Sequence, residues 1–90
     1  MTSRAEVYNI IDGERDYQDS KYATVGGCSA SPEGFLLVIE ELSTQARAAI
    51  TQGQLAPLGD GTVALDFLRK IGATCVRGLE QHGVVPRKVA

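Results

Sequence analysis

The chain has few of the residues on which most catalytic and metal sites depend. Its 90 residues include two cysteines and one histidine. Cys28 and Cys75 give no metal-ligand spacing, and a disulfide-stabilised domain of this length would need more cysteines. With His82 as the single histidine and no visible hydroxyl–base pair, nucleophilic catalysis has little support. We therefore expect both cysteines to be reduced and the protein to act in the cytosol.

The sequence also lacks a long hydrophobic run. It has no stretch of about 18 apolar residues, so we expect no transmembrane helix, and its charged N-terminal segment does not resemble a signal peptide. The net charge of −2 argues against a nucleic-acid polymer as the main partner. Residues 1–65 are acidic overall and residues 66–90 are basic. A basic end of this kind suits a small anionic ligand.

Helical periodicity predicts a first helix from about residue 4 to 18. Ser3 and Glu6 have the spacing of a capping box at its start. Apolar residues then recur at helical spacing, which predicts that this side of the helix faces the core. The opposite side is densely charged, so we expect it to face solvent. The apolar residues are Val7, Ile10 and Ile11, and the charged ones are Asp12, Glu14, Arg15, Asp16 and Asp19.

A second helix is predicted at about 32–52, and we expect the other helices to pack against it. Ser31 is suited to the N-cap position and Pro32 to the first helical position. A stripe beginning at Phe35 collects on one face and predicts the core side. The stripe consists of Phe35, Ile39, Leu42, Ala46, Ala49 and Ile50, whereas Leu37, Glu40, Thr44, Arg47 and Thr51 lie opposite, with Glu41 on the flank.

The third predicted helix, at about 62–82, is apolar over more than half of its circumference. We therefore expect neighbours on two of its sides. Gly72 and Gly78 each cost about 1 kcal/mol relative to alanine inside a helix, and close approach of another helix backbone would explain them. Loops are predicted at 22–31 and 52–61, with a short extended piece at 22–25 left open, and residues 84–90 form a basic tail.

These patterns predict an all-α fold with one small domain. Three helices, one of them apolar nearly all round, make a poor closed unit. We expect a three-helix protomer that completes a four-helix-type core as a homo-oligomer, either a dimer or a larger assembly.

Three features of the sequence support a family resemblance. Residues 14–22 read ERDYQDSKY, the second helix carries the adjacent pair Glu40-Glu41, and the third helix carries Asp66. In this order they resemble the MazG-like all-α nucleotide pyrophosphohydrolases, whose phage-encoded members carry an ER-x-x-Q-D-x-K-aromatic segment. The resemblance extends over residues 6–83. It implies a Mg²⁺ site built from an E-E-x-x-E set on one helix and an E-x-x-D set on the next, because hard cations need several carboxylate oxygens.

Two of the implied carboxylates are missing. Thr44 stands at the third position of the first set, and Arg69 stands at the last position of the second. Glu40, Glu41 and Asp66 are the candidate metal ligands that remain. Since Arg69 can itself hold a phosphate that Mg²⁺ would otherwise bridge, the pattern favours nucleotide binding without hydrolysis and without a metal cofactor.

The leading hypothesis is therefore a phage-type protein that binds a nucleotide at a subunit interface in the cytoplasm of a bacterial host. One use is to sequester a nucleotide messenger, such as a cyclic dinucleotide made by a bacterial defence system. Basic side chains would hold the phosphates and a tyrosine would stack on a base. The predicted ligand-binding residues are Arg15, Tyr17, Lys21, Tyr22, Arg69 and Lys70.

Two other functions stay open. The first is a Mg²⁺-dependent nucleoside triphosphate pyrophosphohydrolase, in which Glu40, Glu41 and Asp66 hold the metal, Glu41 is required for turnover and a metal-held water attacks the phosphate chain. The second is a non-enzymatic helical partner of a host protein, which the apolar face of the third helix would support.

Each candidate residue also has an explanation that involves no ligand. Glu40 and Glu41 fit the solvated side of a helix, and Asp66 with Lys70 fits an ordinary surface pair at i, i+4. Arg15 and Lys21 fit a charged helix end with incidental tyrosines beside them. His82 fits a capping role at the C-terminus of the third helix.

Overall fold

Three helices form the part of the chain that the computed structural model describes, residues 1–22, 30–51 and 61–88. They are α1 (Arg4–Tyr22), α2 (Pro32–Thr51) and α3 (Thr62–His82), and these ranges contain no strand. The all-α prediction with three packed helices is confirmed, and the first helix runs four residues further than expected. The predicted loops, and with them the question of an extended piece at 22–25, lie almost entirely outside the described residues.

Short-range signals in the sequence set the helix ends. The Oγ atom of Ser3 accepts a hydrogen bond of 3.1 Å from the backbone N–H of Glu6, and Oγ of Ser31 accepts one of 3.0 Å from that of Gly34. Both serines are therefore N-caps, as predicted. At the end of α3, Gly83 has φ of 95° and its N–H donates to the Leu79 carbonyl oxygen at 2.7 Å. A residue without Cβ suits this positive φ.

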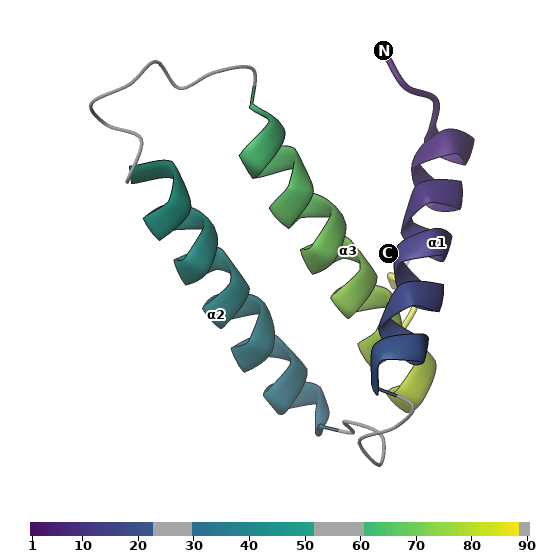
Figure 1. Cartoon of the computed structure of the whole chain (residues 1–90). Helices are drawn as coiled ribbons and strands as arrows, with labels where there is room; N and C mark the ends of the chain where they lie inside the picture. The colour runs from purple at the N-terminus through teal and green to yellow at the C-terminus, as the bar shows by residue number, and fades with distance from the viewer. Residues whose placement is uncertain (23–29, 52–60, 89–90) are drawn as a thin grey trace.

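The central element is α3, not α2. Figure 1 shows α3 between α2 and α1, and α3 packs against both of them. Within the described residues α1 and α2 do not pack against each other. The prediction that the second helix organises the fold is wrong, whereas the prediction that the third helix has two neighbours is confirmed. A helix that is apolar over most of its circumference buries more of its apolar surface between two neighbouring helices than at the edge of the fold.

Two glycines of α3 make room for its two neighbours. A Cβ atom at Gly72 would lie 3.2 Å from Cδ1 of Ile11 on α1, and a Cβ atom at Gly78 would lie 3.1 Å from Cγ of Phe35 on α2. The predicted close approach at both glycines is present. However, the atoms that fill the space belong to side chains and not to a helix backbone, so that part of the prediction is wrong.

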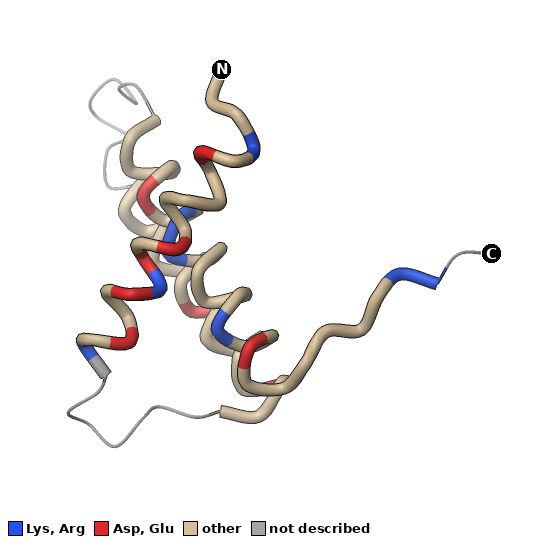
Figure 2. Tube along the Cα trace, turned by 90° about the vertical axis from the view of Figure 1, so that its right-hand side faces the viewer, with Lys and Arg blue, Asp and Glu red and all other residues tan. Residues whose placement is uncertain are grey.

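The first helix docks through its charged side. Val7 and Ile10, which were expected to face the core, are 40% and 55% exposed. Arg15 and Gln18 are buried instead, and Figure 2 shows acidic and basic positions of α1 where it crosses α3. The predicted orientation of α1 is therefore wrong, except at Ile11. Ion pairs with α3, described below, make burial of this side favourable.

The fold is open rather than compact. Among the described residues the buried apolar side chains are Phe35 and Ala73 alone. The Cα radius of gyration is 15.2 Å, whereas a compact domain of this length has about 12 Å. No helix in the described ranges is both long and apolar enough to cross a membrane. The helices therefore leave much apolar surface without cover.

Candidate functional site

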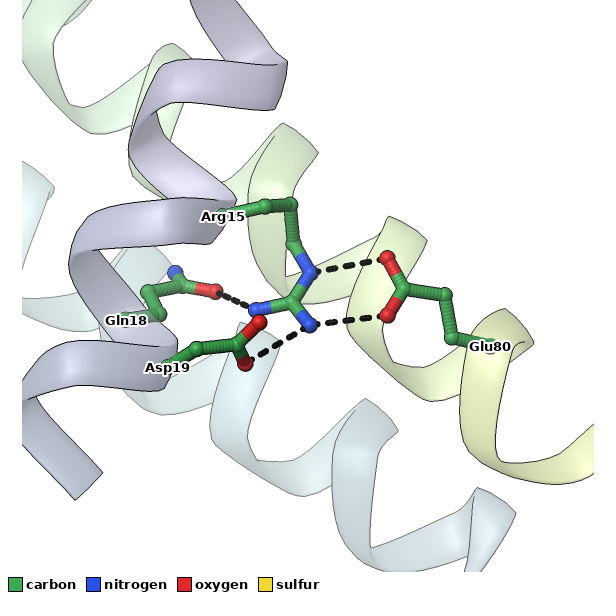
Figure 3. Close-up of polar contacts among 4 residues, drawn as sticks. All are labelled: Arg15, Gln18, Asp19 and Glu80. Atoms are coloured by element: carbon green, nitrogen blue, oxygen red, sulfur yellow. Dashed lines mark hydrogen bonds and ion pairs between the residues drawn. The ribbon is translucent and has the colours of Figure 1, made fainter. Parts of the chain in front are cut away.

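The most highly connected polar group is the guanidinium of Arg15, whose side chain is only 7% exposed. It faces Glu80 of α3 in a two-pronged contact: Nε donates to Oε1 at 3.0 Å and Nη2 donates to Oε2 at 2.8 Å (Figure 3). Such paired, charge-assisted hydrogen bonds fix both the distance and the orientation of the two groups. Arg15 and Glu80 therefore hold the C-terminal half of α1 on the C-terminal half of α3.

Two neighbours on α1 complete this cluster, which we call the Arg15 network. Nη1 of Arg15 donates to the side-chain oxygen of Gln18 at 3.2 Å, and Nη2 also donates to Oδ1 of Asp19 at 2.9 Å. The hydrogen bonds to Glu80 and Asp19 raise the pKa of Arg15, although its burial opposes this. The same contact with Arg15 lowers the pKa of the Glu80 carboxyl. All three guanidinium nitrogens of Arg15 thus have hydrogen-bond partners within this chain, and a phosphate at the predicted site would compete with them.

A second cluster joins α1 to the N-terminal half of α3. Nε of Arg69 donates to Oε1 of Glu14 at 2.7 Å, and its Nη2 donates to Oδ1 of Asp66. Nζ of Lys70 lies 3.1 Å from the other oxygen of Asp66 and 5.0 Å from the centre of the Phe67 ring. Two acids face two bases here, so their charges balance.

The pKa shifts in this cluster follow from the same contacts. Hydrogen bonds from Lys70 and then Arg69 lower the pKa of the Asp66 carboxyl. The hydrogen bonds that Arg69 donates, first to Glu14 and then to Asp66, raise the pKa of its guanidinium. Asp66 is therefore held as a carboxylate by two cations, and a phosphate would compete with carboxylates already in place for Arg69 and Lys70.

The three candidate metal ligands are not brought together. Both oxygens of Asp66 contact cations on α3. Glu40 and Glu41 are exposed on α2, where the Glu41 carboxylate accepts a hydrogen bond of 3.4 Å from Gln45. Within residues 1–22, 30–51 and 61–88, no group of three or more His, Cys, Asp or Glu side chains is arranged to hold a metal ion. The positions of these three side chains therefore do not support the predicted Mg²⁺ site.

Tyr17 and Lys21 are placed differently from the other predicted ligand residues. Tyr17 is 59% exposed and Lys21 is also exposed. They lie one helical turn apart on α1, so their side chains share a face. Tyr22 is the last residue of α1, and its side chain lies outside the described part of the chain. Among the described candidates, Tyr17 and Lys21 are exposed, whereas Arg69 and Lys70 are half-buried and Arg15 is buried.

His82 does not cap α3. Its Nε2 hydrogen bonds across to the backbone carbonyl oxygen of Ala30, just before α2. Its ring also meets the Phe35 ring edge-on, with centroids 6.0 Å apart and an interplanar angle of 71°. The predicted capping role is wrong: His82 joins the end of α3 to the start of α2, and the Gly83 N–H satisfies the last turn instead.

The fold and these contacts define a class of protein, an all-α three-helix protein whose first helix is attached through ion pairs. No family model, curated protein or solved structure matches the chain. The resemblance to MazG-like pyrophosphohydrolases thus depends on the sequence motifs alone. Four of the nine residues of its ERDYQDSKY segment take part in docking α1 on α3: Glu14 and Arg15 contact α3 directly, and Gln18 and Asp19 hold the Arg15 side chain.

Proposed function

We propose that the protein binds a nucleotide without cleaving it, on the face of α1 that carries Tyr17 and Lys21. The observation in support is that these two residues are exposed and stand one turn apart, whereas Arg15, Gln18 and Asp19 of the same segment are hydrogen-bonded to one another. An aromatic ring and a cation on one helix face are a matched pair for a base and a phosphate.

The chemistry of the two groups suits this role. Stacking of a base on an aromatic side chain contributes about 1–3 kcal/mol. The Lys21 ammonium is a compact point charge that pairs with a phosphate oxygen. Arg69 and Lys70 make a smaller contribution than the sequence predicts, because Glu14 and Asp66 already balance their charge.

The absence of turnover is part of the proposal. Thr44 and Arg69 replace two of the acids that the family pattern uses, and Glu40, Glu41 and Asp66 belong to separate surfaces in the described structure. A protein that binds and holds a nucleotide intact can remove a messenger from solution. We propose sequestration of a nucleotide messenger, such as a cyclic dinucleotide of a bacterial defence system, in the host cytoplasm.

A bind-and-release assay tests the proposal. The protein is incubated with Mg²⁺ and a panel of linear and cyclic nucleotides, separated from free ligand and heated, and the released material is identified by chromatography. Intact nucleotide in stoichiometric amount is the expected result. Monophosphate and pyrophosphate in the free fraction would instead support the pyrophosphohydrolase, and Glu41→Gln should then abolish turnover. If nothing binds and nothing is cleaved, the proposal fails and a protein partner becomes the better explanation.

Point variants locate the site. Tyr17→Ala and Lys21→Ala should each weaken nucleotide binding about tenfold or more while helicity is unchanged. Two matched controls, Tyr8→Ala on α1 and Arg47→Ala on α2, remove an exposed tyrosine and an exposed cation elsewhere and should bind normally. Full binding by both Tyr17→Ala and Lys21→Ala would reject this face of α1. Loss of binding in the controls as well would point to a general effect on the protein.

A further inference from the structure

Three of the four glycines inside the described helices have a packing reason. Gly72 and Gly78 make room for side chains of α1 and α2, and a Cβ atom at Gly34 would lie 3.0 Å from Cβ of Ala30. Gly13, in the middle of α1, is different. Among the described residues, a Cβ atom there would meet nothing within 4 Å beyond its neighbours in the chain and the adjoining helix backbone. The packing of the described helices therefore does not require a glycine at residue 13.

Glycine is also unfavourable at this position. After proline it is the residue that disfavours a helix interior most, because its backbone loses the most freedom on folding. Gly13 is the central residue of α1, so neither helix end needs it, and its φ is not positive. Local rules of this kind are most often broken at functional sites, where something outside the fold is contacted. Gly13 is therefore a candidate for such a contact.

Gly13 lies directly beside the site proposed for the nucleotide. Gly13, Tyr17 and Lys21 follow one another at i, i+4 and i+8, so they share one face of α1, one turn apart. A helical side chain leans toward the N-terminus of its helix, over the preceding turn. The Tyr17 side chain therefore leans toward Gly13, and the space next to Gly13 is open.

The surroundings of Gly13 keep this space accessible. Among the described helices α1 packs against α3 alone (Figure 1). Ile11, which meets α3 at Gly72, lies about 160° from Gly13 around α1. Asn9 and Ser20 lie within about 40° of Gly13, and both are exposed. Since Tyr17 is itself 59% exposed, a flat group can reach its ring from the side of Gly13.

We propose that Gly13 is part of the nucleotide site and that the site takes a purine nucleotide, an inference that rests on the proposed function. The base stacks on the Tyr17 ring and extends over the open turn at Gly13, while Lys21 holds a phosphate. The second ring of a purine adds to the contact because it covers the helix backbone at Gly13, and stabilisation grows with the apolar area covered. A pyrimidine is too small to use this turn fully.

A side chain at residue 13 should therefore have two effects of opposite sign. It favours the helix, and a leucine there can also pair with Tyr17 at i, i+4, so the protein becomes more stable. The same side chain fills the space that the base needs, so the affinity for a purine nucleotide falls. An exposed glycine with no role in binding would show the first effect alone.

The test compares the wild type with Gly13→Ala and Gly13→Leu. Calorimetric titration measures binding of ATP and cyclic di-AMP and of their uridine counterparts, and circular dichroism measures Tm at one protein concentration. Both variants should raise Tm by about 4 °C or more. Gly13→Leu should weaken binding of the adenine nucleotides about tenfold or more, with a smaller loss in Gly13→Ala and for the uridine forms. Ala48→Leu is the matched control, since it adds a leucine on an exposed part of α2 and should bind normally.

The outcomes separate this inference from the proposed function. If the wild type binds none of these nucleotides, the proposed function fails and this inference fails with it. If the wild type binds but Gly13→Leu binds equally well, only the role of Gly13 is rejected. Equal affinity of the wild type for adenine and uridine forms would reject the purine assignment.

A double variant tests whether Gly13 acts through access to Tyr17. In the Tyr17→Ala background the ring is absent, so Gly13→Leu should cause little further loss of affinity. Losses that simply multiply in the double variant would show that the two residues act independently, and would overturn the proposed stacking over Gly13.

Discussion

The contact between Gly78 and Phe35 allows a quantitative test of how α2 is attached to α3. An alanine methyl at residue 78 would lie 3.1 Å from Cγ of the Phe35 ring and 3.4 Å from both Cβ and Cδ2. Phe35 is one of the two buried apolar residues in the described structure, with an exposure of 7%. Its ring cannot move aside without disturbing the contact between the two helices.

Two opposing effects set the size of the change. Replacing a mid-helix glycine by alanine stabilises a helix by about 1 kcal/mol, whereas overpacking a filled site costs about 1–3 kcal/mol. Gly78→Ala should therefore lower the free energy of unfolding by up to about 2 kcal/mol. At Gly13 of α1 an added Cβ would meet nothing within 4 Å. Gly13→Ala should thus show only the gain of about 1 kcal/mol.

Thermal unfolding followed by circular dichroism compares the two variants at one fixed protein concentration, because self-association also raises Tm. In a domain of this size 1 kcal/mol corresponds to about 4–8 °C. Gly78→Ala should melt at least about 4 °C below Gly13→Ala. Equal melting temperatures, with both variants above the wild type, would show that Phe35 does not pack against Gly78 and that α2 is attached in another way.

The remaining predictions concern the polar contacts. Glu80→Gln should lower the free energy of unfolding by about 1 kcal/mol at neutral pH, because the Glu80 carboxylate is half exposed and the pair is partly screened. Arg15 lowers the pKa of Glu80 below its ordinary 4.5 in the folded state, so this stabilisation is present above pH 4.5 and is lost as the pH falls below it. The difference between wild type and Glu80→Gln in denaturant unfolding should shrink accordingly, and a constant difference would exclude the ion pair as its cause. Ser31→Ala removes the N-cap of α2 and should cost about 1 kcal/mol, whereas Ser43→Ala on the exposed face of the same helix should not destabilise it, and equal costs in urea unfolding would reject the cap.

The helix positions could be predicted from the sequence because their signals are local. Ser3, Ser31 and Gly83 each act on backbone groups within four residues, and the helix ends that they predict are present. The first helix runs on to Tyr22, where the i,i+4 pair of Arg15 with Asp19 supports its last turns and Lys21 suits the negative end of its dipole.

The orientation of α1 could not be predicted in the same way. Its charged side is buried because the partners of Arg15 and Glu14 lie 65 and 55 residues further along the chain. Periodicity reports which residues are apolar but not which charges will be paired across helices. Glu80 was therefore missed as a partner of Arg15, although the breadth of the apolar surface on α3 correctly indicated two neighbours.

The same limit applies to the site. The sequence places Arg15 and Arg69 among cations that could meet a phosphate, and the structure pairs both with carboxylates. Residue type alone does not separate a ligand-binding arginine from one that docks a helix, since both need a guanidinium near a surface. Tyr17 and Lys21 remain in the predicted ligand set because exposure, which follows from helix packing, leaves them accessible.

The two attachments of α3 differ in kind, and this gives the two outer helices different responses to solvent. Ion pairs through Arg15 and Arg69 hold α1 beside the Ile11 contact at Gly72, and the ion pairs weaken in acid and, because the Glu80 carboxylate is half exposed, in salt. Apolar contact at Phe35 holds α2 and is little affected by either condition. Local opening should thus begin at α1 when the ionic strength rises. In hydrogen exchange, amides of α1 should lose protection first, at a salt concentration where α2 and α3 still exchange slowly together.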